Sequence, residues 1–282
     1  MAMKDWIIDL EFERISAPIK VLKKCIINPL ANYLPAGLLK AWLRAGKSEL
    51  ALENWKDPGG WRSMVISYNA DPKQSIDRML IKSGAIPMAL RNRRKLAARL
   101  MARLIDLVPT PPAQVLCLGA GPGHIVSDAM LEARHDSRAT LVDISSDAFD
   151  YGRQLAEDKG LTERMTFIQG DVRDVHDQLP PHVDLVKMIG ICEYLETPQI
   201  AAIAESLAEV MPAGSSVVFN SISPLHGTDR FFRRVLGLNM IYRTPADLQA
   251  IFAAHGFGEF ETFAEPLGVY NVVVAKRLGG AE

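Results

Sequence analysis

Cysteine is scarce in this 282-residue sequence, which contains only Cys25, Cys117 and Cys192. Three scattered cysteines are too few for a disulfide framework or a zinc site, and they suit a reducing compartment. No apolar run reaches the roughly 20 residues that a membrane-spanning helix needs. The first fourteen residues carry acids where a signal peptide is apolar. We therefore expect a cytoplasmic protein without a metal site, a membrane span or secretory targeting.

An excess of one charge is also missing, because 32 basic residues nearly balance 33 acidic ones. The balance hides an asymmetry: residues 1–112 hold 19 basic and 10 acidic residues, whereas residues 113–282 hold 13 and 23. One interpretation is a basic arm for nucleic acid or an anionic membrane. We favour a basic cap that docks on an acidic catalytic domain of the same chain, because the basic residues are spread over several helical segments.

Residues 1–110 are predicted to be helical, and they are interrupted by prolines and by the loop at 57–60. The strongest helix is predicted over 87–107, where basic residues recur every four positions at 91, 95, 99 and 103. Such a row can grip phosphates, but more often it is a solvated face or pairs with acids nearby. We expect residues 1–110 to form a helical cap or lid and residues 111–282 a second, nucleotide-binding domain.

From residue 113 onward, apolar strand patterns alternate with helical patterns. Strands are predicted at 115–118, 139–145, 165–172, 183–190 and 215–223, and helices at 123–134, 146–159, 197–211 and 245–256. This alternation predicts a parallel sheet with right-handed crossovers. Two final strands without a helix between them predict a hairpin, so the last strand should be antiparallel.

Three sites in successive strand–loop units point to a nucleotide. The turn Gly119-Ala120-Gly121-Pro122-Gly123 follows the first strand, and glycines there let backbone amides approach a ligand at a helix N-terminus. Asp143, at the end of the second strand, is placed to accept hydrogen bonds from ribose hydroxyls. Asp171, at the end of the third strand, can accept from an adenine amine while Val172 packs beside the ring. Either acid alone could simply cap a turn, but the set in register favours a cofactor site.

The spacing G-x-G-x-G, with His124 where a dinucleotide turn has its third glycine, disfavours a nicotinamide dehydrogenase, and no P-loop occurs. These segments resemble the class I S-adenosylmethionine (SAM)-dependent methyltransferases of the small-molecule type, over about residues 113–277. The resemblance implies a Rossmann-like α/β sheet of order 3-2-1-4-5-7-6 with strand 7 antiparallel, here with a helical N-terminal extension. It implies SAM as cofactor, bound by the residues Gly119, Ala120, Gly121, Gly123, Asp143, Ile144, Asp171, Val172, Ile189 and Gly190.

The acceptor side departs from the family pattern. Many small-molecule methyltransferases carry leucine-glutamate-histidine after strand four, but this chain has Cys192-Glu193-Tyr194, so no histidine base is implied. Tyr194 is a candidate to cover the sulfonium by a cation–π contact, and Tyr68 is a second catalytic candidate from the N-terminal region. Both tyrosines could equally be packing residues. Further candidates for the substrate pocket are Cys192, Asn220 and Ser223.

Three functions remain open. Methyl transfer to a small molecule leads, because in-line displacement can rely on proximity and alignment. The second is attack at the γ-carbon of SAM, either cyclisation to azetidine-2-carboxylate or aminocarboxypropyl transfer, since the chain is also similar to azetidine-2-carboxylate synthases and nicotianamine synthases. The third is a non-enzymatic SAM-binding protein. We expect a small-molecule substrate and no nucleic acid, because the DPPY-type tetrapeptide is absent; the sequence does not indicate an oligomeric state.

Overall fold

The computed structural model describes residues 9–174 and 179–279, which divide into two compact units. The unit that we call the helical unit comprises the chain up to Arg93 together with residues 223–242 and 264–270. The sheet unit comprises Arg94–Ile222, Arg243–Phe263 and the chain from Asn271. The two units part inside one long helix, α7 (Ala85–Asp106). The predicted division after residue 110 stays a prediction.

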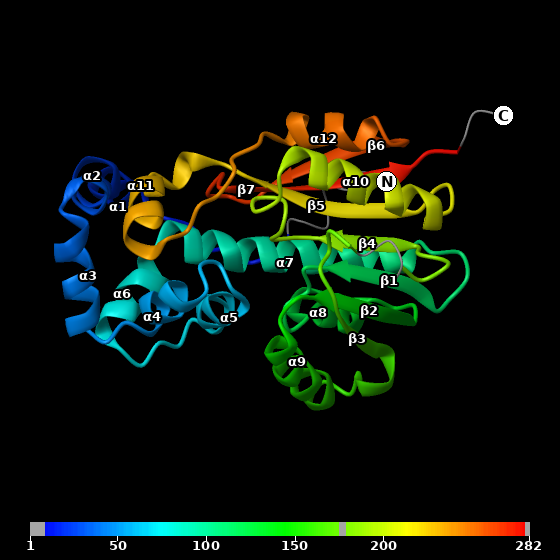
Figure 1. Cartoon of the computed structure of the whole chain (residues 1–282), viewed down its shortest axis with the longest axis horizontal. Helices are drawn as coiled ribbons and strands as arrows, with labels where there is room; N and C mark the ends of the chain where they lie inside the picture. Colours follow the sequence, from blue (N-terminus) through cyan, green and yellow to red (C-terminus); the bar gives the residue numbers. More distant parts are fainter. Residues whose placement is uncertain (1–8, 175–178, 280–282) are drawn as a thin grey trace. The chain divides into compact units, whose positions relative to one another are not determined.

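The sheet has seven strands in the order β3-β2-β1-β4-β5-β7-β6 (Figure 1). The strands are β1 (Ala113–Leu118), β2 (Ser137–Asp143), β3 (Met165–Gln169), β4 (Leu185–Met188), β5 (Ser216–Ile222), β6 (Phe257–Ala264) and β7 (Tyr270–Arg277). The first five strands pair in parallel. Strand β7 is antiparallel to β5: Arg277 N donates to Ser215 O at one end, and Ser223 N donates to Val269 O at the other. The predicted sheet order and antiparallel last strand are therefore confirmed.

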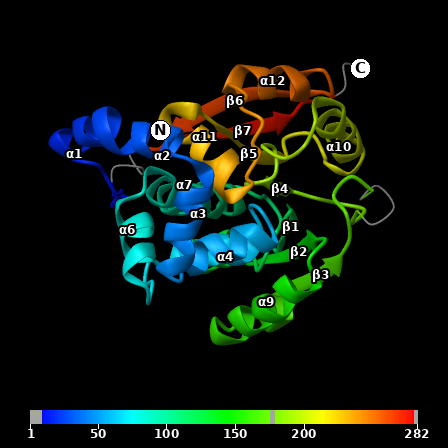
Figure 2. The ribbon, with the colours of Figure 1, turned by 60° about the vertical axis from the view of Figure 1, so that its left-hand side comes forward.

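Helices cover both faces of the sheet. Figure 1 places α10 (Thr197–Val210) and α12 (Pro245–Ala253) together on one face, with α8 (His124–Glu132) and α9 (Ser146–Asp158) on the other. Capping boxes at residues 196–199 and 244–247 begin α10 and α12. The core between these helices and the sheet is closely packed, and the rings of Phe219 and Phe252 stack with centroids 4.4 Å apart. In Figure 2, α9 lies against the outer strand β3.

The helical unit is built from short helices and from a segment that lies far along the chain. Its elements are α1 (Ala17–Leu22), η1 (Lys23–Ile27), α2 (Asn28–Tyr33), α3 (Ala36–Ala45), α4 (Glu49–Lys56), α5 (Trp61–Asn69), α6 (Ser75–Ser83), η4 (Pro224–His226), α11 (Asp229–Phe231) and η5 (Phe232–Leu236). Residues 223–242 pack against the N-terminal helices, with α11 beside α2 (Figure 1). A small core joins Leu39 and Leu43 of α3 to Val235 and Leu236 of η5. This contact brings together residues about 190 positions apart in the sequence.

Two members of the basic row of the 87–107 helix, Arg91 and Arg99, are paired with acids. Arg91 forms an ion pair with Glu13 at 2.5 Å, and it also donates to the carbonyls of Ser67 and Ile81. Elsewhere on α7, Arg99 pairs with Glu132. None of the helices within the described ranges is long and apolar enough to cross a membrane.

Candidate functional site

The glycine turn follows β1 and leads into α8. Gly119, Gly121 and Gly123 all have positive φ, at 58°, 52° and 86°, which side-chain-bearing residues rarely adopt. Space is also limiting, because a Cβ built on Gly119 would lie 1.9 Å from Cγ2 of Ile191. Because three of its five residues are glycines, the turn can bring its backbone amides close to a ligand at the carboxyl edge of the sheet, next to the N-terminus of α8.

Asp143 ends β2 and holds this turn. One carboxylate oxygen accepts from the Gly121 amide at 2.8 Å, and the other accepts from the Ser145 amide at 3.0 Å. The backbone of Asp143 continues the ladder by accepting from the Gly170 amide. An ionised carboxylate offers about four lone-pair sites, so each oxygen can still accept a hydroxyl of a ligand. Sequence reasoning selected Asp143 as a ribose acceptor, and the structure adds that it also orders the turn.

Next to this carboxylate lies an exposed apolar side chain. Ile144 is 67% exposed although it directly follows a buried strand, whereas Val172 is buried near the end of β3. Asp171 lies two residues beyond the observed end of β3, and Arg173 binds both of its oxygens. This pairing lowers the pKa of Asp171 below its usual value, so the carboxylate is ionised at neutral pH. An exposed apolar side chain next in sequence to Asp143 suits the base of a nucleoside.

The loop after β4 is fixed by a buried amide. Gly190 donates its N–H to Asn220 Oδ1 at 2.7 Å, and Asn220 Nδ2 donates to Glu193 Oε2 at 3.4 Å. Asn220 is fully buried on β5, so its observed contacts position this loop. Ile189 is buried just before the turn at Gly190, whose φ is 88°. Contact between Asn220 and a substrate stays a prediction.

Cys192 and Tyr194 differ in what they can contribute. Cys192 is buried, and burial raises the pKa of its thiol above the usual range, so it remains protonated and is a poor nucleophile at neutral pH. Tyr194 is 41% exposed on the same loop, and its amide donates to the Ile191 carbonyl. Tyr194 is therefore accessible to solvent, whereas the buried sulfur of Cys192 serves packing. The catalytic role of Tyr194 and the substrate contact of Cys192 stay predictions.

Two basic residues that sequence reasoning did not select support the site. Lys187 is buried on β4, and its Nζ donates to the Gly119 carbonyl at 3.1 Å. Arg243 donates to the carbonyls of Cys192 and Leu195, at 2.8 and 2.9 Å, and so closes the loop after β4. Lys187 had a visible signal, a lone charge inside an apolar strand. Arg243 had none, because its partners lie about 50 positions earlier.

Two predicted site residues belong to the helical unit. Tyr68 is partly buried on α5, and the Ser223 hydroxyl accepts from the Leu225 amide and caps η4. Their roles at a nucleotide site of the sheet unit stay predictions. Within the described ranges, no group of three His, Cys, Asp or Glu side chains is arranged to hold a metal ion.

Comparison with protein families gives a match over residues 115–214 to the model described as a methyltransferase domain. The match begins in β1 and includes the glycine turn, Asp143, Asp171 and the loop after β4. It covers about a third of the chain, and it is the part that contains the predicted nucleotide site.

Curated relatives share parts of the chain. The tRNA 5-carboxymethoxyuridine methyltransferase of Escherichia coli K12 is 30% identical over 101 residues, 36% of this chain and 37% of that protein. A ubiquinone biosynthesis O-methyltransferase of Actinobacillus pleuropneumoniae is 28% identical over 160 residues, 56% of this chain and 62% of that protein. The chain thus spans about a third to three fifths of the length of these relatives.

Solved structures share the fold at low identity. A protein from Bordetella parapertussis described as a possible exported protein matches with a TM-score of 0.76 and 15% identity, over 99% of this chain and 100% of that one. Magnesium protoporphyrin IX methyltransferase from Synechocystis, solved with bound SAH (S-adenosylhomocysteine), matches with a TM-score of 0.58 and 15% identity, over 84% and 99% of the chains. At this identity the likeness establishes the Rossmann-like methyltransferase fold.

Proposed function

Because residues 115–214 carry a methyltransferase domain on the seven-stranded sheet of the class I SAM-dependent enzymes, we propose that this protein transfers the methyl group of SAM to a small molecule. One observation carries the proposal: Asp143 at the end of β2 binds the amide of Gly121, at the centre of the glycine turn, at 2.8 Å. That contact joins the two parts of a nucleoside site at one edge of the sheet.

The residues present fit SAM. Asp143 keeps acceptor capacity for two ribose hydroxyls, because each oxygen has only one backbone donor in the described chain. The exposed side chain of Ile144 offers an apolar surface for adenine. Asp171 would accept from the adenine amine in exchange for one of its present contacts with Arg173. The turn at Gly119 and the backbone near Gly190 would hold the methionine portion. Bound SAM supplies a methyl group already activated by its sulfonium.

The chain's own part in the reaction is then alignment. Asn220 and Arg243 bind the backbone of the loop after β4 on both sides of Tyr194, which fixes the backbone position from which its ring projects. A ring placed beside a sulfonium stabilises it by a cation–π contact. The buried Cys192 thiol stays protonated, so we assign it no proton transfer. Proximity and orientation can supply much of the rate of an in-line displacement.

A small-molecule acceptor is favoured over RNA by charge. Residues 113–282 carry an excess of ten acidic residues, which would repel a polyanion at this domain. The relative from Actinobacillus is named for methylation in ubiquinone biosynthesis, and the one from Escherichia coli for a tRNA uridine. Attack at the γ-carbon of SAM remains the second candidate, since the segment Cys192-Glu193-Tyr194 provides no histidine base.

The test follows SAM consumption by mass spectrometry. Purified protein is incubated with SAM alone, with a panel of phenols, catechols and amines, and with bulk tRNA. We expect SAH to form only with a small-molecule acceptor, and to be lost in the Asp143→Ala variant. Methylthioadenosine formed from SAM alone, together with a C4 amino acid, would instead assign attack at the γ-carbon. SAH formed only with tRNA would overturn the small-molecule assignment.

A further inference from the structure

The helical unit contains an open cavity on its surface, with a volume of about 350 Å³. Lys40 and Arg44 of α3 line one side, Asn54 and Trp55 of α4 line another, and Leu236 lies at the end of η5. Pockets for small ligands begin at about 300 Å³, and they combine apolar walls with a few polar groups. The size and the lining of this cavity fit that description.

Two unneutralised cations face this cavity. Lys40 and Arg44 are four positions apart on α3, which places them on one face of the helix, where like charges repel. Within the described ranges, neither forms an ion pair, and no carboxylate lines the cavity. Glu53, an acid on the neighbouring α4, is held by Lys56 at 2.6 Å. An anion between Lys40 and Arg44 would relieve their repulsion.

The aromatic wall is preorganised. The guanidinium of Arg44 lies over the Trp55 ring at 5.0 Å from its centroid. The indole N–H of Trp55 donates to the Val235 carbonyl at 2.6 Å, which fixes the ring. A guanidinium stacked on an aromatic ring presents its N–H groups in one plane, and less side-chain freedom is then lost when a carboxylate or phosphate binds.

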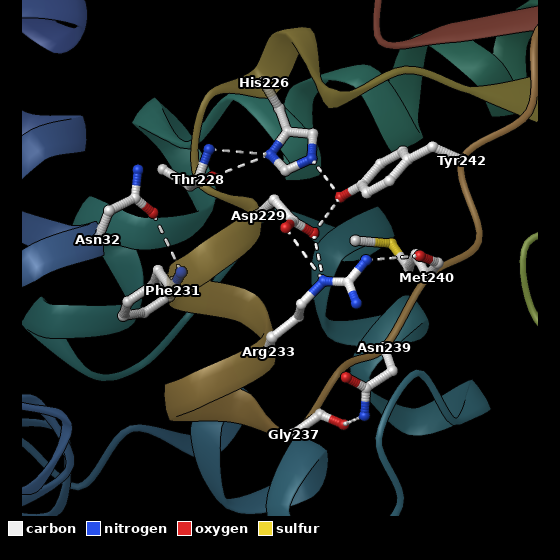
Figure 3. A network of polar contacts seen from close by, with 10 residues as sticks. All are labelled: Asn32, His226, Thr228, Asp229, Phe231, Arg233, Gly237, Asn239, Met240 and Tyr242. Atoms are coloured by element: carbon white, nitrogen blue, oxygen red, sulfur yellow. Dashed lines mark hydrogen bonds and ion pairs between the residues drawn. The ribbon is translucent and has the colours of Figure 1, made fainter.

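The segment that carries Leu236 is held by a partly buried polar network (Figure 3). His226 Nε2 and the Tyr242 hydroxyl lie 3.0 Å apart, and that hydroxyl donates to Asp229 at 2.7 Å. Arg233 binds the same carboxylate and donates to the Met240 carbonyl. The network ties the two ends of the 226–242 segment together, so the cavity wall is set by fixed contacts rather than by a free loop.

We propose that this cavity is a second binding site, for an organic anion with an apolar ring. The carboxylate or phosphate of the ligand lies between Lys40 and Arg44, and its ring lies against Trp55, Pro58 and Leu236. The Asn54 amide, which uses one N–H for the Leu50 carbonyl, is positioned to donate to a further polar group of the ligand. All of its residues belong to the helical unit, and this proposal does not depend on the proposed methyl transfer.

The test is calorimetric titration of the full chain without SAM, using 1-naphthoate, 1-naphthyl phosphate, neutral 1-naphthol and inorganic phosphate. We expect saturable binding of the two ring-bearing anions, with Kd at least tenfold lower than for naphthol or phosphate. Lys40→Gln and Arg44→Gln should each raise Kd at least fivefold. The control Lys82→Gln, which removes the same charge from an exposed position on α6, should leave Kd within twofold. Arg44→Lys keeps the charge but not the planar stack, so its Kd should lie between the values for wild type and for Arg44→Gln.

Circular dichroism should be unchanged in the Gln variants. The melting temperature should be unchanged in Lys40→Gln, which loses no ion pair within the described ranges, and should fall by at most about 4 °C in Arg44→Gln, which loses the stack on Trp55. Naphthol binding as tightly as naphthoate would overturn the anion assignment. Equal affinity of wild type, Lys40→Gln and Arg44→Gln would overturn the site. Loss of tRNA binding in these variants, with no naphthoate binding in the wild type, would assign the two cations to a polyanion surface instead.

Discussion

Replacing Asp143 with asparagine separates its two roles. The substitution keeps the shape but leaves an NH₂ group facing one of the two backbone donors, at Gly121 or Ser145. A hydrogen bond to a charged group contributes about 1.5–3 kcal/mol, and partial exposure of Asp143 puts the loss near the low end. The free energy of unfolding should fall by about 1–2 kcal/mol, which lowers the melting temperature by roughly 2–8 °C for a chain of this size.

The same change should weaken cofactor binding by a separate amount. If ribose hydroxyls donate to the Asp143 carboxylate, loss of its charge costs about 2 kcal/mol of binding free energy, a roughly 30-fold higher Kd for SAM and SAH. Calorimetric titration measures this affinity, and thermal denaturation without ligand measures the stability. Asp150→Asn is the matched control. Asp150 is exposed on α9, and within the described residues its side chain pairs with Arg153 alone.

The melting temperature and the affinity for SAM can respond differently, and their combination shows whether Asp143 binds the ribose or only orders the glycine turn. A melting temperature lowered as expected, with Kd within threefold of wild type, would mean that Asp143 only orders the glycine turn. Unchanged stability together with unchanged affinity would refute both the hydrogen-bond argument and the ribose assignment. An equal effect of Asp150→Asn would attribute the change to net charge rather than to the position of Asp143.

Three further predictions test the packing, the buried histidines and the loop. Gly119→Ala should lower the melting temperature strongly. The positive φ costs a residue with a side chain about 1–2 kcal/mol, and the new Cβ also overlaps Ile191 Cγ2. Adding Ile191→Ala to this variant removes the overlap and should restore part of the lost melting temperature. Burial lowers the pKa of His226 and of His124 to about 4, so the unfolded chain takes up their protons first as pH falls below 6.5. Stability should drop between pH 6.5 and 4 by about 1.4 kcal/mol per pH unit for each histidine, measured by urea denaturation, and an unchanged urea midpoint from pH 7 to 4.5 would contradict this. Tyr194→Phe should keep the rate of SAH formation within about threefold of wild type and Tyr194→Ala should lower it about tenfold; equal loss in both would indicate a role for the hydroxyl instead of the ring.

The local sequence determined the strands of the sheet and the central residues of the nucleotide site, the glycine turn and Asp143. Apolar runs predicted the strands to within a few residues, and the third ended at Gln169, three residues before its predicted end. Parallel strands joined by helices present their carboxyl ends at one edge. The turn at Gly119–Gly123 and Asp143 could therefore be assigned to a common site from the sequence alone.

Tertiary structure alone decided which distant groups support that site. Asn220 reaches Gly190 from 30 positions away, and Arg243 reaches Cys192 from 51. No periodicity or spacing signals such pairs, because each depends on how β4, β5 and the start of α12 pack in space. The same holds for the cavity where Leu236 meets Trp55, about 180 positions earlier in the sequence. Local patterns determine secondary structure and strand ends, whereas contacts between side chains far apart in sequence exist only once the packed chain brings them within hydrogen-bonding distance.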